Sequence, residues 1–219
     1  VTLHVEDEAG GTCSDFVLLT VVADPCAPAV GFWEGSYSLC TADSMFLGEQ
    51  AADWSGASVS SAGDVDGDGK DDLLIGAFGN DDGGLNSDRY GKTFFFFGSY
   101  VDSGGTFDLS LADTSFVGEA KHDNSGYSVS SAGDVDGDGT PDLVIGAIND
   151  NYSGADGGSA TVFSGATGDV LAYLPASMAG DSVGSNVQEA GDVDNDGLGD
   201  FLVGATRAGA GEPGRAILY

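Results

Sequence analysis

Short apolar runs recur along the chain, and each is bounded by Gly, Asp, Asn or Ser residues. Runs such as Leu73–Ile75 and Phe94–Phe97 are apolar at successive positions, as expected for strands that are buried on both faces. No stretch keeps the spacing of apolar residues that an amphipathic helix requires. The pattern therefore predicts an all-β protein of short strands joined by tight turns.

These runs belong to an internal repeat that occurs three times. The string Ser58–Gly69 returns as Ser128–Gly139, and a looser version occupies Ala190–Ala205. Each copy ends in a further strand-like run, at Lys92–Phe97, Ser159–Phe163 and Arg215–Tyr219. Four short strands per repeat of this length suit a propeller blade, whose apolar faces are buried by neighbouring blades.

The repeats divide the chain into a short leading part and a repetitive part. We expect the repeats at about 46–115, 116–175 and 176–219. Residues 1–24 show two strand-like runs around a turn and are predicted to form a β-hairpin. Residues 25–45 are expected to be a linker and a lead-in strand.

The charge of the chain is strongly negative. Asp and Glu number 36 against six Lys and Arg, which gives a formal net charge of -30. This sign argues against nucleic-acid binding, which needs a basic face, and against docking on anionic lipid. Apolar residues make up 41% and aromatic residues 10%, which favours a folded chain over a disordered one. The longest apolar stretch, Phe16–Ala23, is too short to insert across a membrane.

Much of the acidity lies in three nine-residue loops of the form D-x-D-x-D-x-x-x-D. Positions 1, 3, 5 and 9 are carboxylates, and a glycine at position 6 lets the backbone bend. The carbonyl at position 7 can add a neutral ligand. The candidate carboxylate ligands are Asp64, Asp66, Asp68 and Asp72, then Asp134, Asp136, Asp138 and Asp142, then Asp192, Asp194, Asp196 and Asp200.

Carboxylates crowded in this way need a counter-charge. Two of them about 4 Å apart repel by roughly 4 kcal/mol at an effective dielectric of about 20. Four must take up protons, move apart or hold a cation, and a flexible all-oxygen loop suits calcium better than magnesium. An EF-hand is excluded because position 12 is Ile75, Ile145 or Val203 instead of Glu. Solvated acidic turns are the alternative, which three copies at fixed spacing disfavour.

The block G-x-S-V-x-x-A-G-D-x-D-x-D-G-x-x-D-L-x-I-G-A, preceded by F-x-G-E, resembles the FG-GAP repeat over about 46–219. That repeat forms the β-propeller blades of integrin α subunits and of many bacterial secreted proteins. The resemblance implies about three calcium ions, held by the twelve aspartates and the backbone carbonyls of Lys70, Thr140 and Leu198. Family propellers usually have seven blades, so three indicate a fragment or an arc that another chain completes. The hairpin at 1–24 resembles the last two strands of an immunoglobulin-like module of the PKD kind.

These features favour an extracellular, calcium-stabilised propeller-type module for adhesion or surface structure. It is not expected to be an enzyme, because nothing beside the loops looks like a nucleophile with its base. The alternatives are a self-assembling filament subunit that associates through open sheet edges, and the non-catalytic part of a secreted hydrolase. A protein or glycan ligand is expected, which the repeat does not identify.

The three cysteines all lie in the leading part of the chain. An odd number cannot pair completely within one chain. Cys26 and Cys40 could close a short loop, or all three thiols, including that of Cys13, could be reduced.

Overall fold

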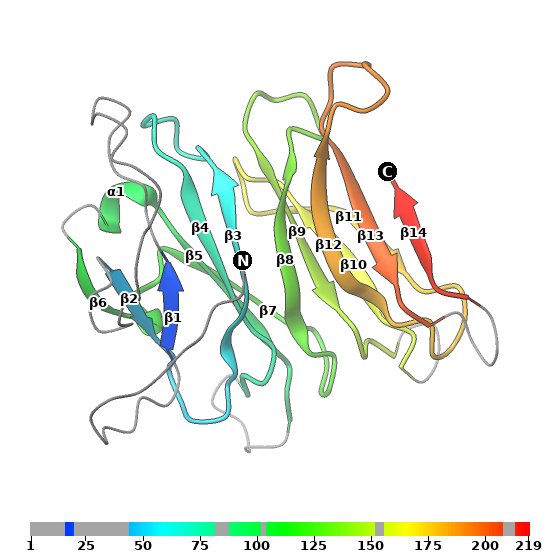
Figure 1. Ribbon diagram of the computed structural model, residues 1–219, viewed down its shortest axis with the longest axis horizontal. Coiled ribbons are helices and arrows are strands. Elements are labelled where there is room, and N and C mark those ends of the chain that lie inside the picture. Colours follow the sequence, from blue (N-terminus) through cyan, green and yellow to red (C-terminus); the bar gives the residue numbers. More distant parts are fainter. Residues whose placement is uncertain (1–15, 20–43, 82–87, 102–103, 152–155, 208–212) are drawn as a thin grey trace, which may run out of the picture.

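A computed structural model describes residues 16–19, 44–81, 88–101, 104–151, 156–207 and 213–219. The described residues form four small sheets that follow one another across the molecule (Figure 1). The three cysteines, the first run of the expected hairpin and nearly all of the expected linker lie outside the described residues.

Three of the sheets correspond to the three repeats, and we call them blades 1, 2 and 3. Blade 1 has the strand order β3 (Ser55–Gly63), β4 (Asp72–Ala77), β5 (Lys92–Phe96) and β7 (Thr114–Val117). Blade 2 has the order β8 (Ser125–Gly133), β9 (Asp142–Ala147), β10 (Ser159–Phe163) and β11 (Val170–Pro175). Blade 3 contains β12 (Val183–Gly191), β13 (Asp200–Ala205) and β14 (Arg215–Leu218). All neighbouring strands within a blade are antiparallel.

The fourth sheet covers one face of blade 1. It contains β1 (Phe16–Leu19), β2 (Ser44–Leu47) and β6 (Gly105–Asp108). β2 pairs antiparallel with β1 and parallel with β6. A short helix, α1 (Gly98–Val101), and a 3-10 turn at Leu109–Leu111 complete this end of the molecule. β1 lies within the second run of the expected hairpin, whose resemblance to an immunoglobulin-like module stays a prediction.

The predicted all-β class and the strand-like runs are confirmed, but the outer strand of blade 1 comes from an unexpected place. β7 includes Phe116 of the F-x-G-E run, which in sequence opens the second repeat. It pairs with β5 of the first repeat, from Lys92 opposite Val117 to Phe95 opposite Thr114. Blade 1 therefore takes its outer strand from the start of the second sequence repeat.

The apolar core is divided among the seams between successive sheets. Leu74 and Phe95 of blade 1 pack with Val129, Leu143 and Ile145 of blade 2. A second cluster fills the seam between blades 2 and 3, and a third lies between blade 1 and the β1–β2–β6 sheet. Fully burying a side chain of this size contributes about 1.5–3 kcal/mol, so the seams hold the blades together.

Hydrogen bonds also cross the seams at the first strand of each blade. Val129 donates its N–H to the Ser58 hydroxyl of blade 1 at 3.0 Å. Val187 donates in the same way to Ser128 of blade 2 at 2.9 Å. A small hydroxyl on one blade thus fixes the position of the next.

Backbones meet directly where each second strand contains a glycine. A side chain at Gly76 would overlap the carbonyl oxygen of Gly126, and one at Gly146 would overlap that of Gly184. The glycine in the predicted L-x-I-G-A run is therefore required by the approach of the next blade. Gly204, at the same position in blade 3, has only Asn186 of its own blade nearby, at 3.3 Å from the added carbon.

This difference gives a direct test of the seams. Gly76→Ala should lower stability by about 2–4 kcal/mol, because a methyl group must displace the backbone of blade 2. Gly204→Ala is the matched control at the same repeat position and should cost less than about 1 kcal/mol. Thermal unfolding at low protein concentration measures both. Equal losses would show that the close approach does not determine the cost.

Candidate functional site

The three aspartate loops lie at the same edge of the molecule. Each connects the first strand of a blade to the second, between β3 and β4, β8 and β9, and β12 and β13 (Figure 1, upper edge). The predicted bend at position 6 is present, with φ of 90° at Gly69 and 93° at Gly139 and Gly197. An added side chain would meet nothing there, so glycine serves the left-handed backbone and not close packing.

Backbone N–H groups orient the carboxylates of each loop. In the second loop Gly139 donates to Asp134 at 2.9 Å, Asp138 donates to Asp136 at 3.0 Å, and Thr140 donates to Asp138 at 2.8 Å. The first and third loops repeat these bonds. The carboxylates at positions 3 and 5 each keep one oxygen outside this network and can offer it to a cation.

Carboxylate oxygens gather within 4.8 Å of one another in every loop. The groups are Asp64, Asp66 and Asp68; Asp134, Asp136 and Asp142; and Asp192, Asp194 and Asp200. In the first loop, Oδ1 of Asp64 is buried and has no hydrogen-bond partner. A buried acceptor without a donor is costly, and a hard cation would satisfy it. The donor set therefore fits a calcium ion.

The aspartate at position 9 has a second role that its spacing does not reveal. Asp72 is completely buried and accepts hydrogen bonds from Val65 at 2.8 Å and from Gly98 at 2.7 Å. Asp142 makes the equivalent bonds in blade 2. Burial raises the pKa of both carboxyl groups. This residue thus ties the loop to the turn that follows the third strand.

The predicted ligands are brought together unequally. Asp72, Asp138 and Asp196 fall outside the three groups. Asp138 and Asp196 lie in their loops, whereas Asp72 is the first residue of β4. The carbonyls of Lys70, Thr140 and Leu198 stay predictions as ligands, as does the role of each individual aspartate.

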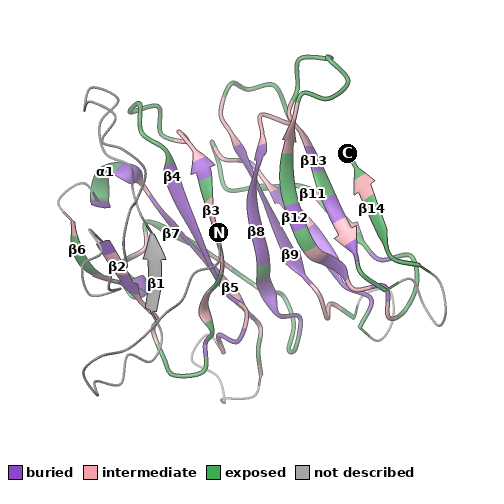
Figure 2. Cartoon of the chain, in the orientation of Figure 1, coloured by how far each residue is buried: buried purple, intermediate pink, exposed green. Residues whose placement is uncertain are grey.

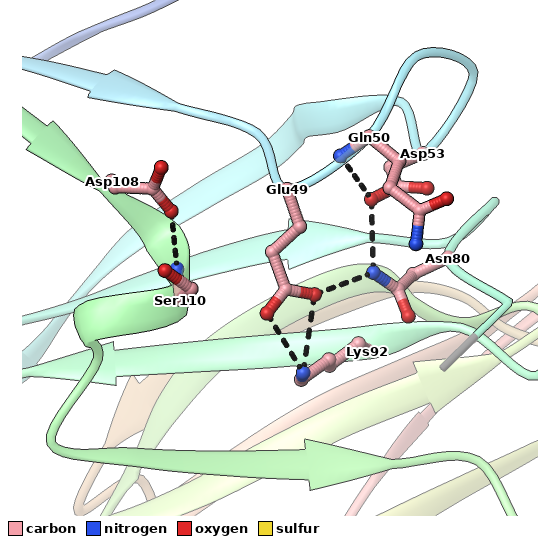
Figure 3. Close-up of polar contacts among 7 residues, drawn as sticks. All are labelled: Glu49, Gln50, Asp53, Asn80, Lys92, Asp108 and Ser110. Atoms are coloured by element: carbon pink, nitrogen blue, oxygen red, sulfur yellow. Dashed lines mark hydrogen bonds and ion pairs between the residues drawn. The ribbon is translucent and has the colours of Figure 1, made fainter. Parts of the chain in front are cut away.

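A second polar cluster lies at the opposite end of the strands of blade 1 (Figure 3). Lys92 places its Nζ 3.2 Å from both carboxylate oxygens of Glu49. Asn80 donates to Glu49 at 3.0 Å and to Asp53 at 2.9 Å, and Gln50 donates its N–H to Asp53. Burial raises the pKa of Asp53, but the cluster contains its own cation. Its arrangement supports a structural role.

Blade 2 contains an equivalent polar cluster that lacks the lysine. Ser159 stands at the position of Lys92, and Asp150 stands at the position of Asn80. Asp150 accepts hydrogen bonds from the hydroxyl groups of Ser159 and Tyr173. The pKa of Asp123 is raised, chiefly by burial and further by the charges of Asp150 and Glu119. Aligning the repeats at these positions could have revealed this acidic cluster.

Asp150→Asn should stabilise the protein, because it removes a charge that disfavours ionised Asp123. We expect a gain of about 1 kcal/mol at pH 7. A raised native pKa means that ionisation of Asp123 costs stability above that pKa, so the gain should shrink as Asp123 protonates at lower pH. Thermal unfolding between pH 4 and pH 7 tests this, with Asp156→Asn in the following loop as the control. A loss of stability at pH 7 would contradict the expectation.

Among the described residues, no helix has the length and apolar character needed to span a membrane.

Comparison with known proteins places these loops in a family. The model of the FG-GAP repeat matches residues 55–87 and 125–163, which contain the first two aspartate loops. The chain is also 34% identical over 172 residues to integrin alpha-5 from Xenopus laevis, an alignment that covers 73% of this chain. The chain spans only 15% of the length of that relative. The chain therefore contains FG-GAP repeats, and its third blade repeats the aspartate loop and the two flanking strands of each matched segment.

Proposed function

We propose that this chain is an extracellular, non-enzymatic propeller-type module that acts in adhesion or as a surface component, with calcium as a structural ion. The observation that carries the proposal is that each of the three loops holds a cluster of carboxylates. In the first loop, Oδ1 of Asp64 is also buried without a hydrogen-bond partner. Similarity to an integrin α subunit supports the surface location and the adhesive role.

Calcium bound in a loop would supply positive charge where the chain has concentrated its negative charge. The twelve aspartates and the carbonyls of Lys70, Thr140 and Leu198 are the proposed ligands, with one ion per loop. Extracellular calcium modules commonly bind with dissociation constants of roughly 10⁻⁴–10⁻³ M, which matches an ion-rich exterior. The proposal couples folding to that environment, because an ion that binds only the native state stabilises it.

An exposed aromatic cluster offers a surface for an adhesive ligand. Trp54 stacks on Phe78, with ring centroids 5.9 Å apart, and Phe78 contacts Tyr127 of blade 2 at 5.3 Å. Trp54 is 58% exposed, and its φ of 56° is a left-handed turn geometry that Asn124 and Ser182 share at the same repeat position. Exposed apolar groups gathered in one place can mark interaction sites. A protein or a glycan is the proposed partner.

Removal of calcium should lower the melting temperature strongly. A site whose free ion is at 100 times the dissociation constant contributes about 2.7 kcal/mol to the free energy of unfolding, and the contributions of the three sites add. Calorimetric titration of the chelated protein should give about three ions per chain. An unchanged melting temperature in chelator would contradict the structural role of calcium.

Single substitutions should separate ligands from other acidic residues. Asp136→Asn removes a proposed ligand and should reduce the number of bound ions by one. Asp71→Asn is the matched control, because Asp71 is exposed at position 8 and lies off the ligand pattern. Equal calcium stoichiometry in the two variants would argue against Asp136 as a ligand.

A further inference from the structure

The second and third aspartate loops touch one another close to the strands that carry them. The tips of these loops are exposed, whereas β8 and β9, which carry the second loop, are largely buried (Figure 2). Between these two zones, Gly199 of the third loop donates its main-chain N–H to the main-chain carbonyl oxygen of Asp134 at 2.7 Å. Asp134 stands at position 1 of the second loop and is a proposed calcium ligand. One carboxylate site is therefore hydrogen-bonded to the backbone of the next.

The two loops are also closely packed at this junction. A carbon added to Gly199 as a side chain would lie 2.8 Å from Cα of Gly133. Carbon atoms in contact are normally about 3.5–4.0 Å apart, so this position has no room for a side chain. Leu198 lies over position 4 of the second loop, with its Cδ2 3.2 Å from a carbon added to Gly137. The junction thus holds the two loops in one fixed relation.

The N–H of this hydrogen bond belongs to a peptide group whose carbonyl is a proposed ligand of the third loop. Leu198, at position 7, contributes the carbonyl, and Gly199, at position 8, contributes the N–H. A trans peptide is planar and directs these two groups to opposite sides. With a cation on the Leu198 carbonyl, the peptide would be polarised and its N–H would become a stronger donor to Asp134. Because Asp134 is then held more firmly, the second loop has less freedom to lose when it binds its own ion.

Asp134 is tied to its own loop through its carboxylate. Gly137 and Asp138 donate their N–H groups to Oδ1, at 2.8 and 3.1 Å, and Gly139 donates to Oδ2 at 2.9 Å. When the carboxylates of the second loop are drawn together, this residue is fixed, and its carbonyl becomes a fixed acceptor for Gly199. Binding in either loop therefore prepares the other.

The junction between the first and second loops cannot form this hydrogen bond. Its position 8 is Pro141, and proline has no main-chain N–H. The ring of Pro141 packs beside Gly63, with its Cγ 2.9 Å from a carbon added there. Apolar packing is similar at both junctions, since Val65 and Val135 at position 2 each lie against the apolar cluster of their seam. The chain thus contains one junction with the hydrogen bond and a matched junction without it.

We propose that the second and third loops bind calcium cooperatively through the hydrogen bond from Gly199 to Asp134, and that the first loop binds independently. This inference rests on the proposed calcium function and adds a regulation of ion occupancy to it. Neighbouring cations repel one another, and moderate salt screens that repulsion. Charge by itself would therefore leave the loops independent or opposed, so positive coupling is diagnostic of the contact. The expected coupling is about fivefold or more, the lower end of the range for linked sites.

Each loop carries its own reporter for a titration with calcium. The position-6 glycines Gly69, Gly139 and Gly197 donate their N–H groups to the position-1 aspartates at 3.0, 2.9 and 3.1 Å. The NMR resonances of these amides therefore report the filling of individual loops. In the wild-type chain, the signals of Gly139 and Gly197 should move together and more steeply than an independent site allows. The signal of Gly69 should follow a simple single-site curve.

Emptying one loop at a time measures the coupling at exposed position-3 ligands. Asp136→Asn in the second loop should weaken calcium binding in the third loop at least about fivefold. The Gly139 signal shows the calcium range over which the second loop is empty, and the comparison is made there. Asp194→Asn in the third loop should weaken binding in the second loop by the same factor, because coupling is reciprocal. Asp66→Asn in the first loop is the matched control and should change binding in the second loop by less than about twofold.

A double-mutant cycle measures the same coupling on protein that is kept in calcium throughout. Urea unfolding is compared for Asp136→Asn, Asp194→Asn and the double variant. The double variant should lose about 1 kcal/mol less stability than the sum of the two single losses, which is the fivefold coupling expressed as a free energy. The losses of Asp66→Asn and Asp136→Asn should simply add.

Gly199→Pro tests the hydrogen bond itself. It removes the N–H, as Pro141 does at the same position of the second loop, and should abolish the coupling in the NMR titration. Gly199→Ala is the matched control, because it also crowds the junction but keeps the donor, so it should retain more of the coupling. Full coupling in Gly199→Pro would overturn the assignment to this bond.

The failure of this inference can be distinguished from the failure of the proposed function. Three ions that bind independently would overturn the coupling and leave calcium as the structural ion. Equal coupling among all three loops would also overturn it, because the first junction lacks the N–H. A chain that binds no calcium in any loop would overturn the proposed function itself, and the inference with it.

Discussion

The architecture depends on the direct contact between backbones at each seam. At Gly76 and Gly146 a carbonyl of the next blade lies where any side chain would be. The serine bonds from Val129 and Val187 lie beside these contacts and fix the same spacing. The two blades that meet at a seam contribute different surfaces to it. Each seam therefore determines which blade follows which, and in what orientation. The apolar clusters then add most of the stabilisation without having to specify the arrangement.

Negative charge is compensated by different groups at the two ends of the strands. At one end the carboxylates accept backbone hydrogen bonds and keep oxygens for a cation. At the other end blade 1 uses Lys92, and blade 2 uses the hydroxyl groups of Ser159 and Tyr173. The buried Asp72 and Asp142 connect the loops to the third strands, so order in a loop is transmitted to the outer part of its blade.

The local features of the fold could be predicted from the sequence because strands and turns leave short-range patterns. The runs at Leu73–Ile75 and Phe94–Phe97 and the spacing of the aspartates identified strands and loops. The pairing of β5 with β7 could not be predicted, since the two strands are separated by α1, β6 and a 3-10 turn. The bond from Gly98 to Asp72 was missed because it joins the turn after the third strand to the first residue of the second strand, and such a contact between distant positions has no local signature. The acidic residues around Asp123 were missed because each looks like an ordinary surface carboxylate when it is considered separately.

The sharing of a strand between blade 1 and the second repeat has a consequence for how such a protein can change in length. The strand that contains Phe116 completes blade 1, so a repeat inserted at this seam would take its outer strand from the repeat that follows it. A cut between the first two repeats would leave blade 1 a strand short, so the first repeat is not an independent unit of stability.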